Sequence, residues 1–234
     1  MMSDPVYAYW FGRADADGVV WLGHGDGRAV RVGETLTVDG DPVLCEHGLH
    51  ASRRVLDALE YGRGSILACV RLSGQIVEGD DKLAGTARET VWLGDVSATL
   101  HRFACDVAER ALQAERAAGR EPDPRSWAAI ATKRRWLAGE ATDAALDEAT
   151  WAAREAAKAA AASNTAMASS VARAAAEAAE AAWSAAWSAT ATEVARTAAW
   201  ACAAKSPQRA AGDQERAWQE AHVRALLRAD GVPV

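Results

Sequence analysis

The chain has few cysteines, no excess of positive charge and no long apolar stretch. Its four cysteines are widely separated among 234 residues, so we expect buried thiols rather than a disulfide framework or a paired-cysteine metal site. The 26 basic residues face 32 acidic ones and form no stripe that would neutralise a nucleic-acid backbone. No run approaches the roughly 20 apolar residues that span a bilayer, and the N-terminus does not resemble a signal peptide. These absences argue against extended nucleic-acid binding and membrane insertion, and they predict a cytoplasmic protein.

The composition changes sharply near residue 96. The chain before this point is rich in Gly, Val and Asp, whereas half of the 64 residues from Ala141 to Ala204 are alanine. Alanine has the highest intrinsic helix propensity of the amino acids. We therefore predict an α+β protein, with a small β-rich domain over residues 5–95 and an Ala/Trp-rich α-helical domain of about five helices over residues 97–230.

Short apolar runs alternate with Gly and Asp turn signals in the first domain, which is typical of strands and hairpins. Apolar residues at helical spacing predict one short helix, with Ser52 as N-cap and Gly62 as terminator. The acidic segment EGDDK is predicted to be a turn between two later strands. The expected strands cover residues 6–11, 19–24, 29–38, 66–77 and 89–93.

Helix signals are strong in the second domain. Asp123 followed by Pro124 predicts the start of one helix, and Thr142 is the expected cap of the next. Trp183 and Trp187 are four residues apart and share a helical face, and Trp200 follows. These three tryptophans are either core anchors, partner-binding residues or the face of a homo-oligomer.

The segments CEHGLHAS (45–52), DALEYG (57–62) and SILACVRLSGQIVEGDDKLAG (65–85) resemble an uncharacterised domain of phage and actinobacterial proteins. The order of strand, helix ending in Tyr and apolar strand is also distantly similar to the ADP-ribosyltransferase fold. That resemblance implies NAD as cofactor and three catalytic candidates: His50 stacked against nicotinamide, Tyr61 near the ligand and Glu89 as the late glutamate.

The first strand departs from the ADP-ribosyltransferase pattern. Members of that fold usually carry a histidine there that binds the ribose, and this chain has Tyr7, Tyr9 and Trp10 instead.

A ligand can still bind without turnover. The ligand-binding candidates are His47, His50, Ser52 and Tyr61. We predict no metal site, because Cys45 and its two neighbouring histidines supply at most three ligands.

The segments HRFACDVAERAL (101–112) and GREPDPRSWAAIATKRRWLAGEATDAALDEA (119–149) resemble an immunity-protein domain associated with polymorphic toxin systems of actinobacteria and phages. That resemblance implies a protein partner, a toxin or effector, rather than chemistry. The leading hypothesis is a non-enzymatic binding protein of such a conflict system, with the helical domain on the partner and a ligand on the β-rich domain. The alternatives are an ADP-ribosyltransferase-like enzyme that uses NAD, and a phage nucleotide-binding sponge that acts against host defence signalling.

Overall fold

The computed structural model of the protein describes residues 4–22, 27–117, 119, 121–162 and 209–234. It divides into two compact units. The first consists of Met1–Ser97 together with Val223–Val234, and the second is Ala98–His222. The segment Val223–Val234, which the sequence placed in a helical domain reaching residue 230, thus groups with the N-terminal unit.

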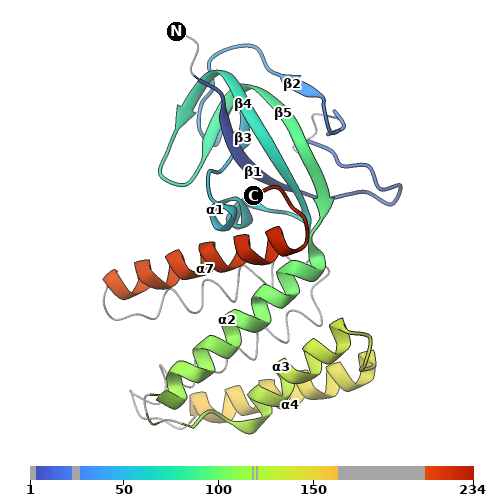
Figure 1. Cartoon of the computed structure of the whole chain (residues 1–234), viewed down its shortest axis with the longest axis vertical. Helices are drawn as coiled ribbons and strands as arrows, with labels where there is room; N and C mark the ends of the chain where they lie inside the picture. The colour runs from blue at the N-terminus through green and yellow to red at the C-terminus, as the bar shows by residue number, and fades with distance from the viewer. Residues whose placement is uncertain (1–3, 23–26, 118, 120, 163–208) are drawn as a thin grey trace. The chain divides into compact units, whose positions relative to one another are not determined.

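The N-terminal unit is built on a five-stranded antiparallel sheet (Figure 1). Its strands pair in the order β1-β4-β5-β2, and β3 also pairs with β5. The predicted α+β class is confirmed. The strands are β1 (Val6–Gly12), β2 (Thr35–Thr37), β3 (Leu49–Ala51), β4 (Ile66–Glu78) and β5 (Leu83–Asp95).

The hairpin of β4 and β5 forms the centre of the sheet. The run from Leu67 to Val70 is buried, as a central strand requires. Ala68 and Val70 pack in one core cluster with Ala8 of β1. The predicted acidic turn is confirmed, because the Gly79 N–H donates to the Lys82 carbonyl at 2.8 Å between the two strands. The strand expected over residues 89–93 is a part of the longer β5.

The prediction of strands over 19–24 and 29–38 is mostly wrong for the residues that the structure describes. Only isolated bridges, such as Trp21 with Ala29, and the short β2 form there. Residues 23 and 24 lie outside the described residues. The Asp15 carboxylate accepts the N–H of Asp17 and of Val19 and the indole N–H of Trp21. Local bonds from side chain to backbone of this kind compete with a strand ladder.

Helix α1 (Val55–Tyr61) follows β3 and begins later than its sequence suggested. Arg54 occupies the N-cap and makes no side-chain capping bond, so the prediction of Ser52 as N-cap is wrong. Ser52 instead exchanges two backbone hydrogen bonds with Tyr9, at 2.8 and 2.9 Å. Gly62 is confirmed as the residue that ends the helix.

Four helices are described beyond the sheet: α2 (Ser97–Ala117), α3 (Pro124–Leu137), α4 (Asp143–Ala162) and α7 (Arg209–Ala229). Two predicted caps are confirmed: Asp123 accepts the N–H of Arg125 at 2.9 Å, and Thr142 accepts that of Ala145 at 3.2 Å. Helices α3 and α4 pack against each other. The Ala-rich helix expected after the break at Ser163 and Asn164, reaching about Ala204, lies outside the described residues.

None of the described helices is both long enough and apolar enough to cross a membrane.

Candidate functional site

Arg88, in the middle of β5, is a charged residue in the core of the N-terminal unit. Its side chain is only 1% exposed. One nitrogen, Nη1, donates to the His50 carbonyl at 2.7 Å, and the guanidinium lies over the Trp10 ring at 4.6 Å from the ring centroid. The other two nitrogens, Nε and Nη2, are buried and have no hydrogen-bond partner. Buried polar groups nearly always have partners, so this side chain requires an explanation.

The register of the sheet places Arg88 on the apolar face. Arg88 is paired with Leu72, and Leu72 in turn with Val6 on β1. Cross-strand partners project to the same face of a sheet, so the guanidinium lies beside the core cluster that contains Leu72. The next residue, Glu89, is paired with Arg71 and projects to the opposite face. The nearest carboxylate in the sequence is therefore directed away from Arg88.

Positive charge accumulates around this position. Burial lowers the pKa of Arg88 to about 10, and the neighbouring Arg28 acts in the same direction. The guanidinium remains protonated at neutral pH, since its pKa still lies well above 7. Among the described residues no carboxylate pairs with it, so a buried positive charge is left without a counter-ion.

A second polar cluster lies at the end of the β4–β5 turn and the end of α1. The Lys82 ammonium donates to the Cys45 sulfur at 3.3 Å and lies over the Tyr61 ring, 4.3 Å from its centroid. The Tyr61 hydroxyl donates to the Asp81 carboxylate. Burial, followed by this bond, raises the pKa of Tyr61. Cys45 has a backbone φ of 67°, a left-handed conformation that is unusual for a residue other than glycine.

His50 connects this cluster with Arg88. Its ring Nε2 accepts the backbone N–H of Cys45 at 3.0 Å, and its carbonyl accepts the bond from Arg88. Burial lowers the pKa of His50, and the positive charges of Arg88 and Lys82 lower it further. The imidazole is consequently neutral at pH 7, which agrees with its role as an acceptor.

The three catalytic candidates are only partly brought together. His50 and Tyr61 are both linked to Lys82, His50 through Cys45 and electrostatics and Tyr61 through its ring. Glu89 is engaged elsewhere, because its carboxylate accepts Nε and Nη2 of Arg71 on the other face of the sheet. A ribose-polarising role requires a carboxylate that faces the same ligand as His50, and Glu89 does not provide one.

The remaining ligand candidates have mainly structural contacts. The His47 ring bonds to the Asp39 carbonyl at 2.6 Å, and Ser52 is buried with its backbone bonded to Tyr9. The expectation of buried thiols holds for Cys69 and Cys105 but is wrong for Cys45, which is exposed. Within the described ranges no group of three or more His, Cys, Asp or Glu residues is arranged to hold a metal ion. Cys202 lies outside those ranges.

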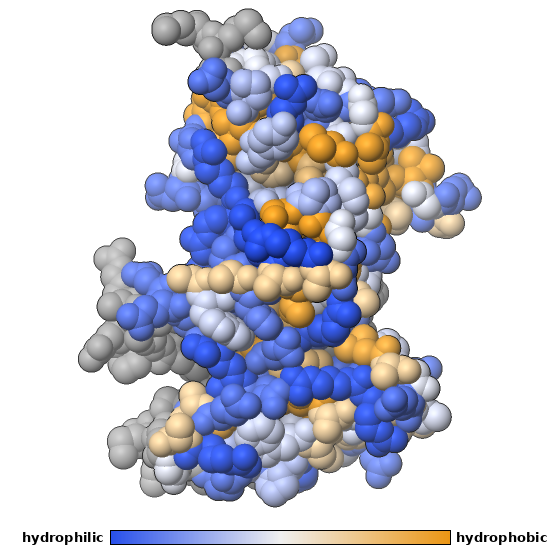
Figure 2. Space-filling model, in the orientation of Figure 1, coloured by the Kyte–Doolittle hydropathy of each residue, from blue (hydrophilic) through white to orange (hydrophobic). Residues whose placement is uncertain are grey.

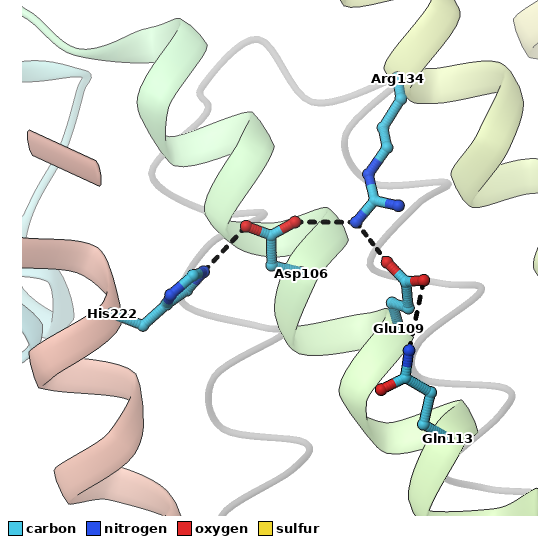
Figure 3. A network of polar contacts seen from close by, with 5 residues as sticks. All are labelled: Asp106, Glu109, Gln113, Arg134 and His222. Carbon is cyan, nitrogen blue, oxygen red and sulfur yellow. Dashed lines mark hydrogen bonds and ion pairs between the residues drawn. The ribbon is translucent and has the colours of Figure 1, made fainter. Parts of the chain in front are cut away.

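The helical unit contains a polar network whose members are all partnered (Figure 3). Asp106 on α2 binds Nη2 of Arg134 and Nε2 of His222, both at 2.8 Å. Arg134 also binds Glu109, which accepts the side-chain amide of Gln113. This network connects α2, α3 and α7, and its satisfied geometry is that of a structural tie.

The predicted partner-binding residues Trp183, Trp187 and Trp200 lie outside the described residues. On the described surface, exposed apolar side chains occur mainly in the N-terminal unit, and Figure 2 shows hydrophobic patches between hydrophilic side chains over its sheet. The helical unit contributes Trp151, which is 58% exposed, with Arg154 and Lys158 near its ring.

No protein-family model, curated protein or solved structure matches the chain.

Sequence reasoning missed Arg88, Trp10 and Lys82. The one available signal was the alternation TARETV, which separates Thr86, Arg88 and Thr90 from the residues between them. That alternation does not say which of the two faces is buried.

Proposed function

We propose that this protein is a non-enzymatic binding protein whose N-terminal unit holds a small anionic ligand at Arg88. The observation that supports the proposal is the buried guanidinium with two unpartnered nitrogens. A buried charge without a counter-ion is strongly unfavourable, and an anion would remove that cost. The positive charges of Arg28 and Lys82 favour the same class of ligand.

Nucleotides are the first ligands to test, since they carry the anionic group and a flat base that suits an aromatic neighbourhood. Purified protein is incubated with NAD and with a panel of cyclic and linear nucleotides, and the thermal unfolding midpoint is measured. We expect a midpoint that rises with ligand concentration, because a ligand that binds only the folded state stabilises it by mass action. Each nucleotide is then recovered and analysed by chromatography.

Recovery of the ligand intact, and loss of the shift in Arg88→Met, would support binding without turnover. Consumption of NAD would overturn the proposal in favour of the ADP-ribosyltransferase-like enzyme. In an enzyme of that kind the catalytic carboxylate would be Glu89. Loss of NAD consumption in Glu89→Gln would therefore identify the enzyme. A panel in which no anion shifts the midpoint would also overturn the proposal.

Engagement of a toxin or effector by the helical unit, in a phage or actinobacterial conflict system, stays a prediction. A sponge that sequesters a signalling nucleotide is one form of the proposed binding function. The recovery step above tests it, because a sponge releases its ligand unchanged.

A further inference from the structure

One edge of the Arg88 guanidinium is fixed in position and unused. Nη1 is held by the His50 carbonyl and one face is covered by Trp10, so the orientation of the group is set from two sides. The unpartnered atoms are Nε and Nη2. These two nitrogens lie on the same side of a guanidinium and present two parallel N–H groups, and we name this side the fork edge.

The same chain shows what this edge binds elsewhere. Arg53 donates from Nε and Nη2 to the two carboxylate oxygens of Glu78, at 2.5 and 2.9 Å. Arg125 contacts the two oxygens of Asp123 in the same way, at 3.0 and 2.8 Å. A fork edge matches the two oxygens of a carboxylate or a phosphate, which is why arginine is preferred for such groups.

We infer that the fork edge of Arg88 receives two oxygens of a carboxylate or phosphate group on the ligand, in the geometry that Arg53 adopts with Glu78. This inference rests on the proposed function and adds the chemical class of the group that is bound. A single water would satisfy a donor but would supply no negative charge. A halide would supply the charge but not two acceptors at the required spacing.

The test uses the full chain and three anions, sodium phosphate, sodium acetate and sodium chloride, at matched ionic strength. Affinity is measured from the concentration dependence of the unfolding midpoint, for the wild type and for Arg88→Lys. Lysine keeps the positive charge but lacks the fork. The matched control is Arg71→Lys, which alters an arginine fork on the opposite face of the same strands.

We expect phosphate or acetate to stabilise the wild type saturably, with at least tenfold weaker binding in Arg88→Lys and no change in the control. Stabilisation by phosphate alone would identify a phosphorylated ligand, and stabilisation by acetate alone a carboxylate. If Arg88→Lys bound the oxyanion as tightly as the wild type, or if chloride stabilised the protein as much as the oxyanions, the inferred two-oxygen contact would be wrong. Anion binding itself would still stand. No saturable effect of any anion would overturn the proposed function as well.

A measurement on the wild type avoids dependence on the folding of the variant. The Arg88 Nε–H is buried, so its proton signal should be protected from exchange and visible in a nitrogen-correlated NMR spectrum. Addition of the stabilising oxyanion should shift this signal, since a charge-assisted hydrogen bond forms at that atom. A signal that stays in place while the protein is stabilised would overturn the inference.

Discussion

Two polar sites, one in each unit of this protein, differ in how their groups are partnered. In the helical unit the carboxylate of Asp106 accepts bonds from both Arg134 and His222, so both of its oxygens have partners. In the sheet unit Arg88 is more deeply buried and two of its nitrogens have no partner. A network whose groups all have partners stabilises the folded state by itself, whereas a buried charge without a partner lowers the free energy of unfolding. The unsatisfied charge therefore marks the place where an anionic ligand would stabilise the fold.

The largest expected effect is an increase in stability. Replacement of Arg88 by methionine removes an uncompensated charge from the core, so we expect the free energy of unfolding without ligand to rise by about 1 to 3 kcal/mol. Urea unfolding followed by circular dichroism measures it. A loss of stability would mean that the bond to the His50 carbonyl and the contact with Trp10 outweigh the buried charge.

Lys133 provides the corresponding test in the helical unit. Its side chain is 0% exposed, its ammonium lies 3.9 Å from the Trp136 ring centroid, and burial lowers its pKa to about 8. The unfolded chain holds this proton up to its ordinary pKa near 10.5. The contribution of Lys133 to the free energy of unfolding is therefore most favourable above pH 10.5. This contribution is lost as the pH falls through about 8.

Between pH 8 and 9.5 we expect the free energy of unfolding to rise with pH by about 1 to 2 kcal/mol, at up to 1.36 kcal/mol per pH unit. Urea unfolding of the wild type and of Lys133→Met at each pH separates this residue from other groups. An identical slope in the two proteins would assign the pH dependence to another residue.

A smaller decrease is expected when the network of the helical unit is broken. The substitution Asp106→Ala leaves His222 without its carboxylate and Arg134 with only Glu109, so we expect a loss of about 1 to 2 kcal/mol. Thermal unfolding measures the loss. The matched control is Glu121→Ala, which removes the exposed partner of Arg116. An equal effect of the two substitutions would show that the network is no stronger than a surface pair.

The smallest effect is expected at the pair of Arg53 and Glu78, whose side chains are 51% and 50% exposed. Water and salt screen such pairs, so Glu78→Gln should cost less than about 1 kcal/mol, and the difference should vanish in high salt. Urea unfolding at low and high salt is the measurement. A cost that persists in high salt would contradict this expectation.

Local sequence signals located many elements well. Asp123 with Pro124 and Thr142 marked two helix starts, because a cap acts within one turn of its own residue. The turn after Glu78 was also predictable from Gly79 and its acidic neighbours. One failure has a local cause as well, because Asp15 binds nearby backbone N–H groups that a strand would use. The other has a long-range cause, because the backbone of Ser52 pairs with Tyr9 from a distant part of the chain.

The candidate site was less accessible to sequence reasoning. His50 and Tyr61 were selected through the resemblance to the ADP-ribosyltransferase fold, and the structure links both to Lys82. Glu89 and Arg88 are adjacent in the sequence but project to opposite faces of β5. Glu89 was selected through the same resemblance, and Arg88 was missed because the alternation does not say which face of the strand is buried.

The sequence by itself determined the class of the fold, because composition, helix propensity and capping act over a few residues at a time. It also determined which side chains can carry a charge. Only the tertiary structure decided which of those charges would be buried and which would find a partner. For Arg88 that outcome depends on the pairing of β5 with β4, on the carbonyl of His50 in β3 and on the ring of Trp10 in β1. These groups come from distant parts of the chain.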